Sequence, residues 1–253
     1  MSHIMQGFPV SPEHRIPRQE WDRAPWNRWS FQHVREILPT VEVWRGNKSA
    51  WKLPKRQVDI SQIEFFDTDA SKTTVAEWLD TSYTDGFIVI HGGEIIYQRY
   101  MNNMHERSLH LSQSMSKSIT AAVAGILMER GLLDPEEQVT HYLPELGSTA
   151  WNGAKLRHVM DMTTGVRYIE DYEALDSDIA ITDIASGWKL APAGYAGPYC
   201  IWDQILSLHH IDREHGAQFQ YRSIETDVLA HCMERVTQMR LAELISRELW
   251  QPL

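Results

Sequence analysis

Ser114 and Lys117 stand three residues apart in the stretch Ser114-Met-Ser-Lys117, directly before a run with helical periodicity. Residues three apart on a helix point the same way, so the lysine amine can reach the serine hydroxyl and help to remove its proton. The N-terminus of a helix adds unpaired N–H groups and the positive end of its dipole beside a developing oxyanion. The spacing therefore favours acyl transfer through a serine nucleophile. The alternative is a serine that caps the helix, with the lysine on its solvated face.

A tyrosine about a hundred residues further on, Tyr221, directly precedes a second helical run that begins near Ile224. A phenol at a junction of loop and helix can approach a nucleophile, and a nearby ammonium favours the phenolate that a general base requires. Taken alone, however, Tyr221 followed by Ser223 is more typical of an interfacial tyrosine and a capping serine.

The elements that would position these residues begin with a predicted hairpin of two β-rich runs, 86–91 and 94–100, separated by Gly92-Gly93. Two glycines supply the positive φ angles of a tight turn. Apolar residues then recur at helical spacing from Ile119 to Leu127, which predicts a helix over 116–130. Helical spacing also occurs in the ranges 74–79, 156–162, 224–236 and 241–249.

This order of elements favours an α+β protein in which a mainly helical domain is inserted into a sheet. We predict an irregular N-terminal arm over residues 1–71, an α/β domain formed by 72–110 and 216–253, and a mainly helical domain over 111–215. Because a two-stranded ribbon is marginal alone, the sheet is expected to need strands beyond these 253 residues. Five aromatic side chains are predicted to hold the arm to the core, namely Trp26, Trp29, Phe31, Trp44 and Trp51.

The chain has 253 residues, with 34 acidic and 24 basic side chains and a formal charge of −10. A net negative charge repels phosphate backbones and anionic lipid, which argues against nucleic-acid and membrane partners. No apolar run approaches the ~18 residues of a membrane span. The N-terminus lacks the basic and apolar regions of a secretory signal, so we expect a cytoplasmic protein.

The densest group of potential metal ligands is the run of His209, His210, Asp212, Glu214 and His215. No tetrahedral ligand spacing is evident there, so a solvated polar loop is favoured and no metal is predicted. The two cysteines have no metal-binding spacing. Glycine-rich nucleotide motifs and the G-x-S-x-G elbow do not occur in the sequence, and we expect no cofactor.

Taken together, the sequence resembles the serine β-lactamase and penicillin-binding protein superfamily, in which S-x-x-K and Y-x-N or Y-x-S motifs share one cleft. Within it, the resemblance is strongest to the 6-aminohexanoate-dimer hydrolases, which are nylon-oligomer amidases, and to related carboxylesterases. It implies a β-lactamase/transpeptidase-like fold, an antiparallel sheet flanked by helices with an inserted helical domain. The stretches that carry the resemblance are 26–31, 111–118, 139–146, 170–172 and 218–229.

The resemblance implies that Ser114 is acylated, that Lys117 is its proton acceptor or electrostatic partner, and that Tyr221 carries protons to the leaving amine or alcohol. The function implied is hydrolysis of a small linear amide or ester, the small-molecule partner of the site. Alternatives are a β-lactamase or D,D-peptidase, which the missing signal sequence disfavours, and a non-catalytic penicillin sensor or binding module. Whether the protein forms a homodimer is left open by the sequence.

Three further residues take substrate-binding roles by the same resemblance. Tyr172 matches a tyrosine that closes over the amide, Asp183 matches the carboxylate that holds the amino end, and Ser223 stands where the family usually has asparagine. For Asp183 a turn residue is an equal alternative. Family members continue with strands that carry a Lys-Thr-Gly-like or His-x-Gly motif, so the chain ending at Leu253 is expected to be C-terminally truncated and poorly active alone.

Overall fold

The computed structural model describes residues 3–253 and divides into two compact units. The first unit comprises Met1–Ile37 and Ser49–Leu111, and the second comprises Leu38–Lys48 and Ser112–Leu253. Among the described residues, all strands belong to the first unit and the long helices to the second. No helix in the described part of the chain is long and apolar enough to cross a membrane. The domain boundaries given above stay a prediction.

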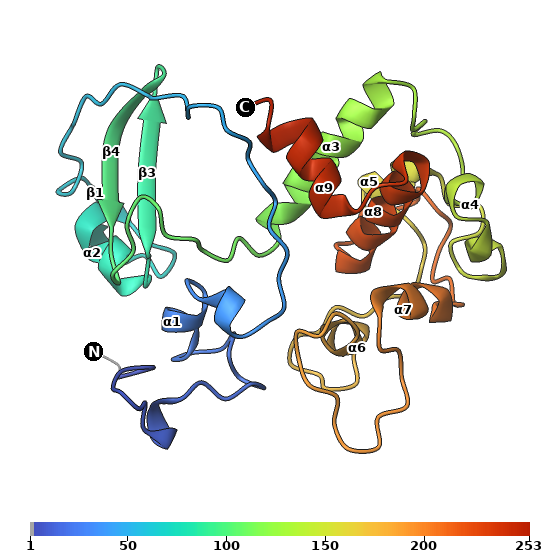
Figure 1. The fold of residues 1–253 in the computed structure, drawn as a ribbon, viewed down its shortest axis with the longest axis horizontal. Coiled ribbons are helices and arrows are strands. Elements are labelled where there is room, and N and C mark those ends of the chain that lie inside the picture. Colours follow the sequence, from blue (N-terminus) through green and yellow to red (C-terminus); the bar gives the residue numbers. More distant parts are fainter. Residues whose placement is uncertain (1–2) are drawn as a thin grey trace. The chain divides into compact units, whose positions relative to one another are not determined.

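The predicted hairpin is confirmed as strands β3 (Gly86–His91) and β4 (Glu94–Tyr100), which pair antiparallel in the first unit (Figure 1). Gly92 and Gly93 form the turn with φ angles of 58° and 79°, in the left-handed region that glycine adopts without steric cost. The backbone of residues 54–58 runs along β4 and adds hydrogen bonds to it. Part of the predicted arm is therefore bonded to the sheet.

The remaining elements of the first unit are short. The predicted helix near 74–79 is confirmed as α2 (Val75–Thr81), which begins with a capping box between Thr74 and Glu77. It follows the small antiparallel pair β1 (Glu64–Phe66) and β2 (Lys72–Thr74). The arm contains α1 (Asn27–Ser30) and the 3₁₀ turns η1 (Pro12–His14) and η2 (Val34–Glu36).

The aromatic anchors of the arm differ from the predicted set. Trp44 and Trp51 are exposed, so the prediction that they pin the arm was wrong. Trp21 is fully buried and takes that role, with its ring edge against Phe31. A tryptophan count cannot tell which rings are covered, because no periodicity marks the buried face of an irregular segment.

The second unit is built around two long helices, α3 (Met115–Glu129) and α8 (Ser223–Thr237), and both confirm predictions. The C-terminal helical prediction is confirmed as α9 (Leu241–Ile245), which continues into the π-helical turn η4 (Ser246–Trp250). The short elements are α4 (Val139–Tyr142), η3 (Pro144–Ser148), α5 (Leu156–Met160), α6 (Asp178–Ala185) and α7 (Ile201–Ser207). Of these, only α5 had a helical pattern in the sequence analysis.

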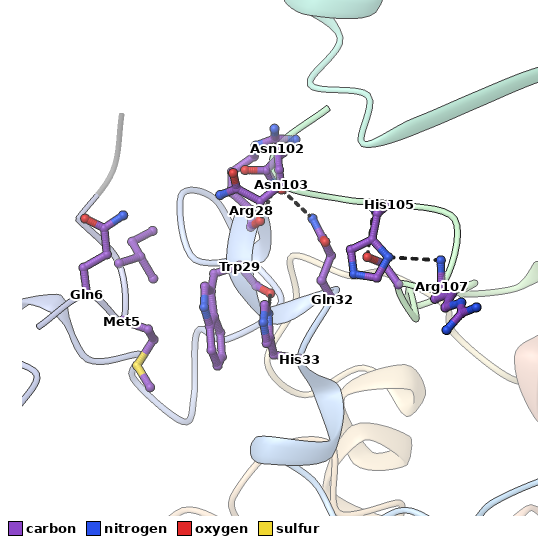
Figure 2. Close-up of a pocket in the computed structure, with 12 residues that line it drawn as sticks. Met5, Gln6, Arg28, Trp29, Gln32, His33, Asn102, Asn103, His105 and Arg107 are labelled. Atoms are coloured by element: carbon purple, nitrogen blue, oxygen red, sulfur yellow. Dashed lines mark hydrogen bonds between the residues drawn. The ribbon is translucent and has the colours of Figure 1, made fainter. Parts of the chain in front are cut away.

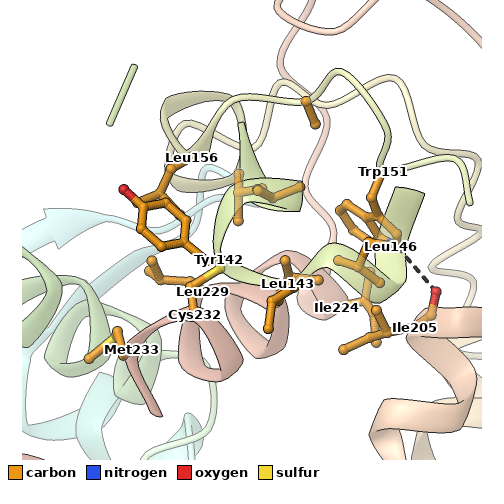
Figure 3. Close-up of a cluster of buried hydrophobic side chains, with 14 of the residues drawn as sticks. Tyr142, Leu143, Leu146, Trp151, Leu156, Ile205, Ile224, Leu229, Cys232 and Met233 are labelled. Carbon is orange, nitrogen blue, oxygen red and sulfur yellow. Dashed lines mark hydrogen bonds between the residues drawn. The ribbon is translucent and has the colours of Figure 1, made fainter. Parts of the chain in front are cut away.

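Helix α8 lies at the centre of this unit and packs against α3, α4, α5, α7 and α9. One face of it buries Ile224, Val228, Leu229, Cys232 and Met233, which recur at helical spacing (Figure 3). Burial of each such side chain stabilises the fold by roughly 1.5–3 kcal/mol. The N-terminal ends of α3 and α8 are thus fixed within one packed body.

Candidate active site

Ser114 occupies the N-cap position of α3, where its side chain makes no capping hydrogen bond. The Nζ atom of Lys117 donates instead to Ser114 Oγ over 3.0 Å. The helix stripe that includes Val123 and Leu127 is buried, which fixes the rotation of α3 and keeps the lysine on the serine's side. The structure therefore disfavours the alternative of a capping serine with a solvated lysine.

The turn before the serine is held in an uncommon conformation. Gln113 has a φ of 49°, a left-handed conformation that costs a residue with a side chain about 1–3 kcal/mol. Its carbonyl accepts hydrogen bonds from the backbone N–H of Ser116, at 3.1 Å, and from the Ser116 hydroxyl, at 2.7 Å. These bonds offset the strain and fix the direction in which the chain enters α3, and with it the exposed Ser114 hydroxyl.

Tyr221 lies directly before α8 and presents its ring to the same lysine. The Lys117 Nζ atom is 5.6 Å from the ring centroid, within the range of a cation–π contact. The backbone N–H of Gln220 donates to the carbonyl of Met162 over 2.9 Å, which ties this loop to the segment after α5. The structure thus brings together Ser114, Lys117 and Tyr221, although 104 residues separate the last two.

Directly after Tyr221 in the chain, two fully buried side chains, Arg222 and Glu225, are hydrogen-bonded to each other. Arg222 donates to Glu225 Oε1 over 3.3 Å and to the carbonyl of Thr164 over 3.0 Å, and the Thr164 hydroxyl donates to Glu225. Burial raises the pKa of Glu225 to about 8, and burial also lowers the pKa of Arg222. Because Arg222 is covalently next to Tyr221, this pair fixes the backbone that carries the phenol.

Glu170 joins two of the predicted substrate-binding residues. Its carboxylate accepts hydrogen bonds from both the backbone N–H and the hydroxyl of Ser223, each at 2.7 Å, and from the Tyr172 hydroxyl at 2.5 Å. Burial, and next the hydrogen bond to Glu170, raises the pKa of Tyr172 to about 12. Tyr172 and Ser223 are therefore both hydrogen-bonded to the carboxylate of Glu170, at the start of α8.

Asp183 lies within α6, so the turn alternative for this residue was wrong. Its carbonyl accepts hydrogen bonds from the backbone N–H of Lys189 and the hydroxyl of Ser186, which close the C-terminal end of the helix. The structure gives this residue no place in the groove beside Lys117, among the residues described.

That groove has a volume of about 520 Å³ and runs along α3 and α8. Its polar lining includes Lys117, Ser223 and Asp227, and the rest is mostly apolar. Burial raises the pKa of Asp227 to about 6, although the positive charge of Lys117 acts in the opposite direction. Asp227 is not among the site residues predicted from the sequence.

A second cavity, of about 510 Å³, lies within the first unit (Figure 2). Some of its polar side chains are already paired: Gln32 donates to the carbonyl of Asn102, and the rings of Trp29 and His33 stack with centroids 3.9 Å apart. These contacts hold the arm in place, and this cavity has no serine paired with a lysine among its described lining residues.

The histidine-rich run does not form a metal centre among the described residues, where no group of three or more His, Cys, Asp or Glu side chains could hold an ion. His215 bonds instead to the backbone: Gly165 donates to its Nδ1 atom, and Nε2 lies 3.2 Å from the carbonyl of Asn152. Burial lowers the pKa of this histidine. The loop is thus held by its own hydrogen bonds.

Comparison with known proteins identifies the family of this chain. A model of the β-lactamase family matches residues 82–253, more than half of the chain. The chain belongs to this family. The match includes both motif segments of the site, so the Ser114–Lys117 pair and Tyr221 lie within the β-lactamase domain, and the predicted β-lactamase-like fold is confirmed at the level of the family.

The relatives of this β-lactamase-family chain include hydrolases. It is 34% identical over 233 residues to the 6-aminohexanoate-dimer hydrolase of Paenarthrobacter ureafaciens, covering 92% of this chain and 57% of that protein. A Bacillus anthracis structure described as a candidate 6-aminohexanoate-dimer hydrolase superposes with a TM-score of 0.87 at 27% identity, covering 96% of this chain and 63% of that one. EstCE1, a hydrolase with promiscuous acyltransferase activity, shares the fold, with a TM-score of 0.51 at 20% identity over 70% of this chain and 49% of that one. The chain spans less than two thirds of the length of the first two.

Three residues of the site were missed from the sequence. Glu170 was seen only as part of a similar stretch, and neither the burial of the Glu225 carboxyl group nor the groove position of Asp227 was anticipated. Glu225 and Asp227 lie in the stretch Ser223-Ile-Glu-Thr-Asp, which carries two acids on a helix with a strong apolar stripe. An acid that replaces an apolar residue on the buried face of a predicted helix is the signal that could have found Glu225.

Proposed function

We propose that this protein is a serine hydrolase that cleaves a small linear amide or ester through an acyl-enzyme on Ser114. The observation that carries the proposal is the convergence of three groups: Lys117 Nζ lies 3.0 Å from Ser114 Oγ and 5.6 Å from the centroid of the Tyr221 ring. A hydroxyl, an ammonium or amine, and a phenol within this reach are the groups that acyl transfer requires.

In the first half-reaction Ser114 Oγ attacks the substrate carbonyl carbon, and its proton passes to Lys117 or Tyr221 as the new C–O bond forms. The positive end of the α3 dipole lies beside Ser114 and favours the negative charge that develops on the carbonyl oxygen. Collapse of the tetrahedral intermediate breaks the bond to the leaving amine or alcohol, which takes a proton from Tyr221. Water then attacks the acyl-enzyme in the same way and frees Ser114.

The substrate class is proposed from the 6-aminohexanoate-dimer hydrolase that is 34% identical to this chain. Tyr172 and Ser223 are proposed to border a bound substrate, and their shared hydrogen bonds to Glu170 at the start of α8 support this role. Asp183 in α6 does not line the groove beside Lys117, and its proposed contact with the amino end of the substrate rests on the family resemblance alone. Action in the cytoplasm, without a cofactor, stays part of the proposal.

A labelling experiment on the full-length protein tests the proposal. A fluorophosphonate probe is expected to add its mass to Ser114, and the protein is expected to turn over a simple ester or linear amide. Ser114→Ala should abolish both, whereas Ser118→Ala, which removes an exposed hydroxyl one residue beyond Lys117, should retain them. Absence of any adduct on Ser114 would refute the proposal.

The same experiment with penicillin separates the rival functions. Turnover of penicillin would make the protein a β-lactamase, and a stable penicillin adduct without ester turnover would make it a sensor. A second relative, a β-lactamase of Providencia stuartii, is 28% identical but over only 120 residues, so the linear substrate is the one we favour.

A further inference from the structure

The cavity in the first unit has positively charged and neutral polar side chains in its lining, and no acid among its described lining residues (Figure 2). It is formed by the N-terminal arm with α1 and by the turn that follows β4. None of its described lining residues belongs to the second unit, which contains Ser114. The whole chain has a net charge of −10, so a cavity of about 510 Å³ that lacks carboxylates differs from its surroundings and favours an anionic occupant.

Two arginines line this cavity, and one of them already has a carboxylate partner. The guanidinium of Arg28 lies 2.8 Å from Asp85, a largely buried acid that neutralises it. For the exposed guanidinium of Arg107, the described residues provide no hydrogen bond or ion pair. Its neighbour in the sequence, Glu106, does not line the cavity. Arg107 therefore supplies one uncompensated positive charge, which matches the charge of a monoanion.

Three further hydrogen-bond donors accompany this guanidinium. The Nδ1 atom of His105 accepts the backbone N–H of Arg107 over 3.1 Å, so the ring proton lies on Nε2, which is free to donate. The Ser108 hydroxyl oxygen accepts the backbone N–H of His105 over 3.0 Å and keeps its own proton for another acceptor. The side-chain amide of Asn103 has no partner in the described part of the chain. The short segment 103–108 thus provides four donors to one cavity.

Hydrogen bonds fix the frame that carries these donors. The Asn102 amide donates to the carbonyl of Arg28 over 2.6 Å and to Asp85 over 3.1 Å. The Gln32 amide donates to the carbonyl of Asn102 over 3.0 Å. The turn after β4 is thereby tied to α1 and the residues that follow it, so a ligand would meet a preformed site and would lose little affinity to ordering it.

The arm completes the lining with the apolar side chains of Ile4, Met5 and Trp29. We propose that this cavity binds a small organic monocarboxylate, with its carboxylate on Arg107 and its apolar chain against Trp29. A guanidinium fork matches the two oxygens of a carboxylate, and one positive charge with neutral donors suits a monoanion better than a phosphate dianion. Hydrolysis of an amide or ester releases a molecule of this class, but the site is separate from the serine site and does not depend on the proposed function.

NMR titration of the ¹⁵N-labelled full chain with sodium hexanoate, at constant ionic strength, tests the inference. The indole N–H signal of Trp29 should shift saturably, with a Kd on the order of 1 mM for so small a ligand. Arg107→Gln should weaken binding at least about tenfold, because the charge-assisted hydrogen bonds are lost, and Arg107→Lys should weaken it less. Hexanamide has the same shape without the charge and should also bind at least about tenfold more weakly. Arg35→Gln is the matched control, because it removes an exposed arginine of the same arm that does not line the cavity.

Hexanoate that binds Arg107→Gln as tightly as the wild type, or a lack of saturable shifts up to about 50 mM, would overturn the inference. Sodium phosphate that binds as tightly as hexanoate would contradict the assignment to a monocarboxylate. If Arg107→Gln does not fold, the wild type decides, since equal affinities for hexanoate and hexanamide would refute a carboxylate site. Ser114→Ala should leave the shift of Trp29 unchanged, so this inference and the proposed function stand or fall on separate measurements.

Discussion

Replacing Glu170 by glutamine should loosen the start of α8 and the residues held there. The carboxylate accepts three hydrogen bonds, two from Ser223 and one from Tyr172, at 2.5–2.7 Å. It also lies at the N-terminus of a 15-residue helix whose N-cap residue, Arg222, provides no side-chain cap. An amide has one oxygen, so its NH₂ group would face at least one N–H or O–H donor.

The cost can be estimated from these contacts. A hydrogen bond to a charged acceptor is worth about 1.5–3 kcal/mol, and a carboxylate at a helix N-terminus about 0.3–1 kcal/mol. Because Glu170 is only half-buried, we take the lower end and expect Glu170→Gln to lower the free energy of unfolding by about 2 kcal/mol. For a chain of this size that corresponds to a fall in Tm of about 4–8 °C.

Thermal unfolding followed by circular dichroism, with kcat/KM measured in parallel, checks this expectation. Asp176→Asn is the matched control, because it removes an exposed carboxylate six residues along the same segment. Activity of Glu170→Gln should fall by about tenfold or more, since displacements near 1 Å at a site can cost about a hundredfold. A Tm within 1–2 °C of the control, with unchanged kcat/KM, would refute the role of Glu170 as the tie between Tyr172 and α8.

Three other predictions concern the serine site and its support. Ser114→Ala should abolish ester turnover, and Tyr221→Phe should lower kcat by about a hundredfold, measured on one substrate at constant pH. Burial raises the pKa of Glu225 from 4.5 to about 8, so between these pH values the folded protein holds a proton that the unfolded chain releases. The free energy of unfolding should therefore fall by up to about 1.4 kcal/mol per pH unit as the pH rises from 4.5 to 8. Urea titrations at several pH values measure this fall, which Glu225→Gln should lack. Gly165→Ala should lower the free energy of unfolding by about 3 kcal/mol or more, because the new Cβ atom would lie 1.7 Å from the carbonyl oxygen of Arg213. A variant with the Tm of the wild type would contradict this close contact between Gly165 and the Arg213 carbonyl.

The sequence predicted the regular elements where periodicity or turn chemistry was strong. The hairpin at Gly92-Gly93 and helices α3 and α8 lie within one residue of their predicted bounds. Helices α4, α6 and α7, of four to eight residues, were missed, although the equally short α2 and α5 showed a helical pattern. Their positions are set by tertiary contacts instead.

The site was predictable to the same degree. The i, i+3 spacing of Ser114 and Lys117 determines their contact once α3 exists, so the local pair could be inferred from sequence alone. The approach of Tyr221 depends on the packing of α8 against α3 and could be expected only from the family resemblance. Glu170 could not be found in this way, because its hydrogen bonds to Ser223 cross 53 residues and leave no local pattern.

The hidden pair of Arg222 and Glu225 has a consequence for anyone who tries to improve or redirect this protein. Buried side chains that no substrate contacts orient the phenol of Tyr221. Substitutions of Thr164 and Glu225 should therefore reduce activity as much as substitutions of the residues that line the groove. Mutant libraries restricted to residues that line the groove would omit those positions. Selections for faster variants should therefore also recover substitutions of buried residues.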